Sequence, residues 1–339
     1  MVASLVTTLR PAQAGGAQAF VCDLAQGLVM RGHTVELYCA AGSDVPGVDV
    51  VPIEVGPEVA DARVMPGGRV APSVAALTDG FERLFTTLRF RGADAVSLHA
   101  FDAAAFDSQN FGPGHVPTLH TLHLPPLVPA VVAAAARCRD SLITVSEATR
   151  REWEAAGVTG IGVIRNGVPD FDPGTPLVER RAIIAGRISP EKGIEDAIEA
   201  SRLAGLPLSI VGDVYDSEYR EARLRDVQII PAMSRPDLWR RFASSAASVL
   251  PVQWEEPFGL VAAESQVMGC PVAAYRRGAL PEVVEEGVSG YLAEPGDVED
   301  LARAMRECVL LDRAAVRASG RRRLLIDRCV SEYEAVLSR

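Results

Sequence analysis

Short runs rich in β-branched and other apolar residues alternate with longer helical patterns along this chain, and the alternation occurs twice. In the first half the predicted strands are residues 3–8, 34–39, 95–99, 118–123, 141–145 and 162–165. In the second half they are residues 181–185, 208–211, 227–230, 248–252 and 271–274. Helical patterns lie between them, at residues 17–31, 194–204, 236–243 and 298–310. Such alternation predicts parallel sheets flanked by helices.

A loop rich in proline, glycine and aspartate, NGVPDFDPGTP at residues 166–176, separates the two series and predicts a domain boundary. A length of 339 residues also suits about two domains. We expect an α/β protein with two doubly wound parallel-sheet domains, residues 1–168 and 169–325, and a C-terminal helix at 326–339 that can pack back on the first domain. Ligands bind such sheets outside the carboxyl ends of their strands, so we expect a cleft there between the domains. Residues 55–92 are the hardest to interpret, and we expect a long loop around their Val-Met-Pro-Gly-Gly stretch.

The composition excludes several classes of protein. Apolar residues make up 48% of the chain, which is enough for folded cores. The formal net charge of −10 argues against a general nucleic-acid binder and gives no global attraction to an anionic membrane. No apolar run approaches the roughly 20 residues of a membrane span, and the opening MVASLVTTLR lacks a signal-peptide pattern. We therefore expect a soluble, cytoplasmic protein whose six cysteines, none in a CxxC pair, are reduced and mostly buried.

The stretch EEPFGLVAAES, residues 255–265, lies between a predicted strand and a helical pattern that starts near Gly259. The backbone amides of Phe258, Gly259 and Leu260 would be unpaired donors at a helix N-terminus, which suits a phosphate or sugar oxygen. Glu256 would point from the turn into the cleft. Glu264 lies about one and a half turns into the helix that starts near Gly259, where it can accept two hydrogen bonds from a vicinal diol such as a ribose. An acid that complements the helix dipole, followed by an exposed glutamate, would give the same pattern.

Two further turns carry groups that suit a phosphorylated ligand. Arg187 and Lys192, in RISPEKG, follow the strand predicted at 181–185 and open the next helix. A planar guanidinium and a compact ammonium are the groups that bind a diphosphate. Gly15 and Gly16 follow the first predicted strand, and two glycines there let the backbone approach a phosphate or a sugar closely.

Taken in chain order, these motifs resemble those of the retaining, nucleotide-sugar-dependent glycosyltransferases of family 4, whose GT-B fold consists of two Rossmann-like domains. The resemblance covers nearly the whole chain, through GGAQAFVCDLAQGLVMRGHTVELY, PTLHTLHLP, LITVSEATRRE, VIRNGV, GRISPEKG, SIVGD, EPFGLVAAESQVMGCPV and GALPEVVEEGVSGYLAEPGD. Its most specific part is the E-x7-E run from Glu256 to Glu264. The resemblance implies transfer of a sugar from a nucleoside diphosphate sugar to a hydroxyl of a small-molecule, glycoside or lipid acceptor. Retention at the anomeric carbon is implied as well, and no metal or other cofactor is expected.

The roles that the resemblance implies divide by chemistry. The acids bind hydroxyls, with Glu256 at the transferred sugar and Glu264 at the ribose. The cations Arg187 and Lys192 neutralise the leaving diphosphate. The set that completes the donor site consists of Gly15, Gly16, Gly212, Met233, Phe258, Gly259 and Leu260.

Three histidines fall at or near the ends of predicted strands. His123 ends PTLHTLH and matches the histidine that reaches the donor sugar in this family, so we include it among the catalytic residues. His120 lies three positions earlier and faces the other side of the strand, which argues against a metal site built from the two rings. His99 is either a cleft residue or a packing residue.

Three positions depart from the family pattern. Gln18 stands where the family has a glutamate, and Ala279 places a methyl group in a loop that is usually Gly-Gly. Pro231 replaces a glycine after the strand predicted at 227–230, which affects the nucleobase contacts expected near Met233.

Other motifs point to functions that we weigh against transfer. Asp170-Phe171-Asp172 has the DxD form of a metal motif from a different glycosyltransferase fold, but it lies in the interdomain loop, so we expect solvated acids there. Two alternative functions stay open. One is a phosphorylase of the same fold that uses inorganic phosphate and a glycoside, and the other is a non-catalytic nucleotide-sugar-binding protein.

Overall fold

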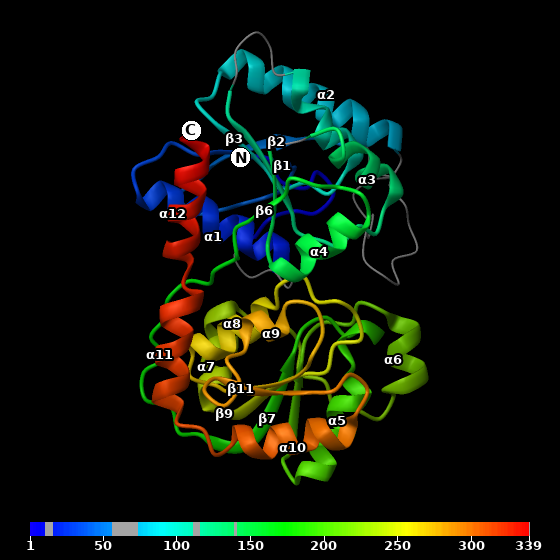
Figure 1. Cartoon of the computed structure of the whole chain (residues 1–339), viewed down its shortest axis with the longest axis vertical. Helices are drawn as coiled ribbons and strands as arrows, with labels where there is room; N and C mark the ends of the chain where they lie inside the picture. Colours follow the sequence, from blue (N-terminus) through cyan, green and yellow to red (C-terminus); the bar gives the residue numbers. More distant parts are fainter. Residues whose placement is uncertain (11–15, 56–73, 111–115, 139–140, 339) are drawn as a thin grey trace. The chain divides into compact units, whose positions relative to one another are not determined.

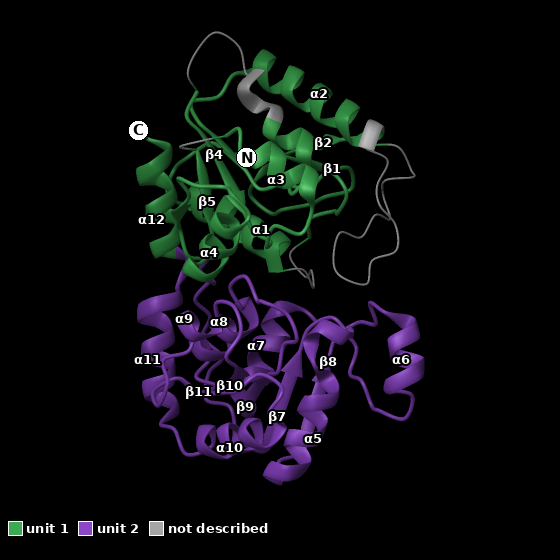
Figure 2. Cartoon of the chain, turned by 45° about the vertical axis from the view of Figure 1, so that its right-hand side comes forward, with its two compact units in different colours: residues 1–165, 327–339 green, residues 166–326 purple. Residues whose placement is uncertain are grey.

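The computed structural model describes residues 1–10, 16–55, 74–110, 116–138 and 141–338. The chain forms two compact units, residues 1–165 together with 327–339 (unit 1) and residues 166–326 (unit 2), which Figure 2 colours separately. Each unit contains a parallel sheet and helices, and the prediction of two doubly wound α/β domains is confirmed. Among the described residues no helix combines the length and the hydrophobicity that a membrane span needs.

The sheet of unit 1 is parallel and is joined through the first residues of the chain. Strands β3 (Val96–Leu98), β4 (Thr118–Leu122), β5 (Leu142–Thr144) and β6 (Gly162–Val163) lie in that order. Strands β1 (Glu36–Ala40) and β2 (Asp49–Ile53) form a second pair. Val2 bridges Tyr38 of β1 and Leu98 of β3, so it connects the two sets.

One expectation for unit 1 is wrong. Residues 3–8 form no strand, because the chain keeps only the Val2 bridge and backbone hydrogen bonds at Ala3 and Ser4 before it turns away. The segment 55–92, which was the hardest to interpret from the sequence, contains α2 (Val74–Arg91) in its second part. This helix buries Leu77, Phe81, Leu84 and Leu88 at the spacing of one helix face. The Val-Met-Pro-Gly-Gly stretch lies outside the described residues.

The other helical elements of unit 1 are α1 (Gly16–Met30), η1 (Ala103–Asn110), α3 (Pro129–Ala135), α4 (Glu147–Ala155) and α12 (Ile326–Leu337). Helix α12 joins the core of unit 1, where Cys329, Val330 and Tyr333 are fully buried. Val330 packs against Gly27 of α1 so closely that a Cβ at Gly27 would lie 2.7 Å from its Cγ2. The cysteines follow the expectation of burial, since all six are buried, and none of them forms a disulfide bond.

The sheet of unit 2 has the order β11-β10-β9-β7-β8 and is parallel throughout. Its strands are β7 (Glu179–Ala185), β8 (Leu208–Val211), β9 (Ser245–Leu250), β10 (Val272–Tyr275) and β11 (Gly290–Ala293). The expected strand at 227–230 is wrong, because only Ile230 bridges Val211 at the edge of the sheet. Strand β11 was not expected.

Helices cover both faces of this sheet (Figure 1). Helices α5 (Ile194–Ala204) and α10 (Val298–Cys308) pack against each other and share a core with alternate residues of the strands. Helix α8 (Leu260–Val267) packs on β9 and β10 and against α11 (Arg313–Leu324). The remaining elements are η2 (Pro190–Lys192), α6 (Ser217–Arg223), α7 (Arg235–Ser244) and α9 (Leu280–Val283).

The strand order of unit 2 locates a site. Strand β8 lies on one side of β7 and β9 lies on the other, so the chain reverses its direction across the sheet between these strands. At such a switch point the loops that leave the two neighbouring strands separate, and ligands bind between them at the carboxyl ends. The loop after β7 carries Arg187 and Lys192, and the loop after β9 and the helix that follows it carry Glu256 and Glu264.

Candidate active site

Lys192 and Glu256 meet at the carboxyl edge of unit 2. The Lys192 ammonium lies 3.2 Å from Oε2 of Glu256, and the indole N–H of Trp254 donates to the same oxygen at 3.0 Å. The ammonium also lies 5.5 Å from the centre of the Trp254 ring, within cation–π distance. Oε1 of Glu256 has no partner in the described part of the chain. One carboxylate oxygen is therefore fixed and the other is open to a ligand.

The loops after β7 and β9 are held together through their backbones. The amide of Gln253 donates to the Glu191 carbonyl at 2.8 Å. Gly193 has a left-handed conformation (φ 66°), and a Cβ there would lie 1.9 Å from the Pro251 carbonyl oxygen. Only glycine fits this contact, which brings Lys192 next to Glu256.

The Arg187 side chain is held by its neighbours, and part of its guanidinium group remains exposed for an anion. Its guanidinium carbon lies 5.0 Å from the centre of the Tyr215 ring, and one nitrogen lies 3.4 Å from Glu191 Oε1. The Ser189 hydroxyl donates to the same buried carboxylate at 2.7 Å. The Arg187 side chain keeps 21% of its surface exposed, so it can bind an anion without leaving this support.

Helix α8 begins at the predicted turn with free donors. Gly259 caps it in a left-handed conformation (φ 90°), and a Cβ there would lie 2.9 Å from Leu280. The amides of Phe258, Gly259 and Leu260 donate to no group within the described ranges. Free amides at a helix start, together with the helix dipole, favour an anion or a sugar oxygen.

The loop after β10 is hydrogen-bonded to the turn that precedes α8. The amide of Gly278 donates to Glu255 at 2.6 Å, and that of Ala279 donates to the Glu256 carbonyl at 2.8 Å. Ala279 is fully buried, so its methyl group, a departure from the family pattern, lies inside the protein. Sequence reasoning assigned no role to Glu255, which holds this loop in place.

Glu264 is paired with a residue that sequence reasoning missed. Nε and Nη2 of Arg235 lie 3.1 and 2.8 Å from Glu264 Oε1, and both side chains are largely buried. The Arg235 guanidinium also stacks over Trp239, 4.9 Å from the ring centre. Oε2 of Glu264 has no partner among the residues described, so one acceptor stays available for a diol.

The loop after β8 contains the last predicted donor-site positions of unit 2. Gly212 lies against Gly186, and a Cβ would approach the Gly186 carbonyl oxygen to 1.7 Å, so packing alone requires glycine there. Met233 is half-buried, and Pro231 is exposed. The amide of Ala232 donates to Asp213 at 3.1 Å, which ties this loop to the end of β8.

The other predicted residues belong to unit 1. His123 follows β4 and is 7% exposed, and its Nε2 lies 2.9 Å from Nδ1 of His99. His120 is also buried and stacks on Phe106, with ring centres 4.8 Å apart. Gly16 is the exposed first residue of α1, whereas Gly15 lies outside the described residues.

The candidate metal motif is occupied by ion pairs. Asp170 lies 2.5 Å from Arg321, and Asp172 lies 3.5 Å from Arg317. In the part of the chain that the structure describes, no cluster of three or more histidine, cysteine, aspartate or glutamate side chains could hold a metal ion.

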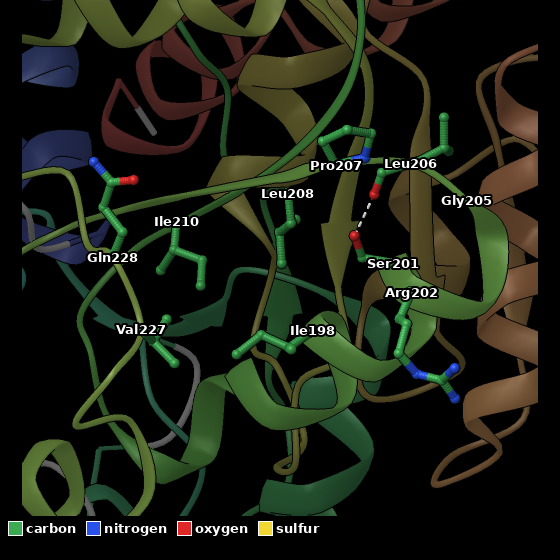
Figure 3. Close-up of a pocket in the computed structure, with 10 residues that line it drawn as sticks. All are labelled: Ile198, Ser201, Arg202, Gly205, Leu206, Pro207, Leu208, Ile210, Val227 and Gln228. Atoms are coloured by element: carbon green, nitrogen blue, oxygen red, sulfur yellow. Dashed lines mark hydrogen bonds between the residues drawn. The ribbon is translucent and has the colours of Figure 1, made fainter.

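A cavity of about 490 Å³ lies at the amino end of β8, beside α5 (Figure 3). Its wall is largely apolar, with Ile198, Leu208 and Val227, and the Ser201 hydroxyl donates to the Leu206 carbonyl. It contains none of the predicted site residues, and it lies at the opposite end of β8 from Gly212.

Comparison with known proteins agrees with this arrangement. The family described as Glycosyltransferase Family 4 matches residues 14–170, and the family described as Glycosyl transferases group 1 matches residues 170–323. A glycogen synthase of Mycobacterium tuberculosis is 34% identical over 228 residues, which cover 61% of this chain and 54% of the relative. The D-inositol 3-phosphate glycosyltransferase of Mycolicibacterium smegmatis is 29% identical over 352 residues, which cover 88% of this chain and 79% of the relative.

Solved structures show the same fold. Anabaena Alr3699/HepE, in complex with UDP and glucose, has a TM-score of 0.74 at 19% identity and covers 99% of both chains. AviGT4, a glycosyltransferase involved in avilamycin A biosynthesis, has a TM-score of 0.68 at 22% identity and covers 100% of this chain and 97% of its own. The two family matches lie side by side along residues 14–323, so the chain resembles the family 4 glycosyltransferases in sequence and has the GT-B fold of two Rossmann-like domains.

Proposed function

We propose that the protein transfers a sugar from a nucleoside diphosphate sugar to a hydroxyl acceptor. The observation that carries this proposal is the grouping of Arg187, Lys192 and the free amides of α8 at the switch point between β7 and β9. Two fixed cations and a helix N-terminus can together neutralise a diphosphate, which is the leaving group of such a donor. The complex of Alr3699/HepE with UDP and glucose supports a donor of this class.

The two acids then bind different parts of the donor. Oε2 of Glu264 accepts from the ribose diol, while Arg235 balances the charge that this buried carboxylate brings near the diphosphate. Oε1 of Glu256 accepts from a hydroxyl of the transferred sugar, while Lys192 and Trp254 hold the other oxygen. We also propose His123 and Gly16 as donor-site residues.

We further propose that the configuration at the anomeric carbon is retained and that no metal takes part. Glu256 and Glu264 do not form the nucleophile and acid pair of a retaining glycosidase, because Glu264 serves the ribose. Instead the leaving phosphate accepts the acceptor's proton on the same face of the sugar. Arg187, Lys192 and the amides stabilise the negative charge that develops on that phosphate, as a metal does in other transferases.

Calorimetric titration with UDP, GDP and ADP tests the diphosphate assignment. Each cation contributes about 1.5–3 kcal/mol through charged hydrogen bonds, so the double variant Arg187→Ala/Lys192→Ala should bind the preferred nucleotide at least about 100-fold more weakly. Arg181→Ala is the matched control, because Arg181 is exposed and lies away from the carboxyl end of β7. Unchanged affinity in the double variant would contradict the assignment.

Transfer assays with the preferred sugar nucleotide separate the remaining functions. Product formation that survives EDTA, with the anomeric configuration of the donor kept, supports a metal-independent retaining transferase. Turnover of a glycoside with inorganic phosphate and no nucleotide would instead identify a phosphorylase.

A further inference from the structure

Three buried side chains of unit 1 form a hydrogen-bonded line at the carboxyl ends of two neighbouring strands. Ser97 Oγ lies 2.9 Å from Nε2 of His99, and Nδ1 of His99 lies 2.9 Å from Nε2 of His123. Ser97 belongs to β3, and the two histidines directly follow β3 and β4. The three residues are only 2%, 6% and 7% exposed. Both ring nitrogens of His99 and Nε2 of His123 therefore each have one defined neighbour.

Both rings are neutral at pH 7. Desolvation by burial lowers the pKa of His123 to about 4 and lowers that of His99 well below its ordinary value. A neutral imidazole carries one proton, so each ring donates through one nitrogen and accepts through the other. The hydrogen bonds of the line can then point from donor to acceptor in only two ways, either from Ser97 towards His123 or from His123 towards Ser97.

The Ser97 hydroxyl selects between these directions. In one, Ser97 donates to His99 Nε2, His99 Nδ1–H donates to His123 Nε2, and His123 keeps its proton on Nδ1. In the other, every proton lies on Nε2, and the Ser97 hydroxyl hydrogen has to find another acceptor. The structure gives Ser97 Oγ no second partner in the described residues. A buried hydroxyl without an acceptor costs about 1–3 kcal/mol, so the first direction is favoured.

We propose that Ser97 and His99 are positioning residues that hold His123 in a single neutral tautomer, with Nδ1–H as a fixed donor to an oxygen of the bound sugar. Nδ1 of His123 has no partner among the described residues and is not a fully buried atom, so it is the end of the line that a ligand can reach. The use of this donor in sugar binding rests on the function proposed above, whereas the tautomer itself does not.

This assignment restricts the chemistry of His123. A neutral ring with a protonated Nδ1 donates to a hydroxyl oxygen, but it cannot remove a proton from the acceptor through that atom. Rings of Phe20 and Tyr333 pack around the pair, with centres 5.5 Å from His123 and 6.0 Å from His99, and they restrict both rings. His123 therefore binds and orients the sugar, and deprotonation of the acceptor belongs to other groups.

Nitrogen-15 NMR of the full-length protein at pH 7 tests the tautomer without any assay of activity. Protonated and unprotonated ring nitrogens give well separated signals, and the chain has only five histidines, which single His→Gln variants assign. We expect His99 and His123 both to carry the proton on Nδ1. A proton on Nε2 of His123, or an average between the two forms, would overturn the proposal.

Ser97→Ala tests the positioning role. The variant should give His123 a mixture of tautomers and lower kcat/KM for the sugar nucleotide by about three- to tenfold, the effect of one neutral hydrogen bond. Ser97→Thr, which keeps the hydroxyl, should restore the single tautomer. Ser209→Ala, at a buried position of β8 in unit 2, is the control and should change neither the His123 signals nor kcat/KM.

The outcomes separate the two proposals. An unchanged His123 spectrum in Ser97→Ala would overturn the positioning role. The expected tautomer in a protein that transfers no sugar would contradict the proposed function and leave the hydrogen-bonded line in place.

Discussion

Glu256 shares one oxygen between Lys192 and Trp254 and leaves the other open. Glu256→Gln keeps the shape and an acceptor for both neighbours but removes the negative charge. We expect kcat to fall by about 100-fold or more, as when a fixed electrostatic group of an active site is lost. Steady-state kinetics with the sugar nucleotide measure this, and circular dichroism shows whether the fold is kept.

Glu255→Gln is the matched control for that experiment. Glu255 is the adjacent residue, and a glutamine there can still accept from the Gly278 amide. We expect a change of less than about threefold in kcat, since only an exposed charge and its ion pair with Arg277 at 3.4 Å are lost. Near-normal transfer by Glu256→Gln in a folded protein would show that Glu256 has no direct part in the reaction.

Arg235 and Glu264 form a largely buried pair, with side chains 12% and 9% exposed. Arg235→Met should destabilise the protein by about 3 kcal/mol, because it leaves a buried carboxylate without its partner. Arg240→Met on the same helix removes a pair that is more than half exposed and should cost below about 0.5 kcal/mol. Urea denaturation of both variants gives the comparison, and equal losses would show that burial of the pair does not matter.

At the level of residues, the sequence located the charged groups but not their partners. The positions of Arg187, Lys192 and Glu256 relative to strand ends follow from chain order alone, because every strand of a parallel sheet ends at the same edge. Arg235 and the contact between His99 and His123 could not be found in this way. Each depends on which strands and helices become neighbours, which local patterns do not encode.

Two glycines with nearly the same backbone conformation allow the cost of a left-handed conformation to be distinguished from the cost of a steric contact. Gly193 and Gly205 have φ values of 66° and 65°, but only Gly193 lies against another backbone, the Pro251 carbonyl. Gly205→Ala should cost about 1–2 kcal/mol for the left-handed conformation. Gly193→Ala should cost about 2 kcal/mol more, because the loops after β7 and β9 must move apart.

The same pair predicts a difference in activity. Gly193→Ala displaces Lys192 from Glu256 and should reduce transfer, whereas Gly205→Ala should leave kcat unchanged. Thermal unfolding and steady-state kinetics of the two variants provide the comparison. Equal effects on stability and activity would contradict the role given to the contact between the two loops.

Among the elements, three segments that prediction missed or misplaced, β2, β11 and residues 227–230, lie at sheet edges, although the edge strands β6 and β8 were predicted. Strands β8, β9 and β10 and residues 182–185 of β7 are largely buried, and small and apolar residues dominate them. Only Ile53 of strand β2 is buried, and the strand contains Pro52, so it lacks that signal. Residues 227–230 have the composition of a strand but lie beside β8 at the sheet edge, where only Ile230 pairs. The composition of the chain thus predicts the buried strands of a sheet, but it does not predict where the sheet ends.

For the whole molecule, acid should act mainly on unit 1. His99, His120 and His123 are buried there, and burial lowers the pKa of each, to about 4 for the last two. No histidine lies between residues 166 and 326. Between pH 6.5 and 4 the unfolded chain binds protons that the folded rings do not, so stability falls as the pH falls. His120 and His123 should each cost about 2 kcal/mol at pH 5 relative to pH 7.5.

Asp102 opposes this loss in part. Burial raises its pKa to about 6, so the folded state binds a proton below that value and gains about 1 kcal/mol at pH 5. Urea denaturation at pH 7.5 and pH 5 measures this. In a Trp239→Phe/Trp254→Phe variant the fluorescence comes from Trp153 and reports on the unfolding of unit 1. Trp153→Phe reports on unit 2. An equal loss of unfolding free energy in the two units between pH 7.5 and pH 5 would show that the buried histidines are not the cause.

Helix α12 belongs to unit 1 although all of unit 2 precedes it in the chain. It supplies the fully buried Cys329, Val330 and Tyr333, and the Tyr333 hydroxyl hydrogen-bonds with Thr121 of β4 at 2.8 Å. During synthesis on the ribosome, residues 1–165 emerge long before the helix that fills their core. Unit 2 is continuous and can fold as soon as it emerges. The usual order, in which the N-terminal domain folds first, is therefore reversed at its last step: the first unit to be made is the last to be completed.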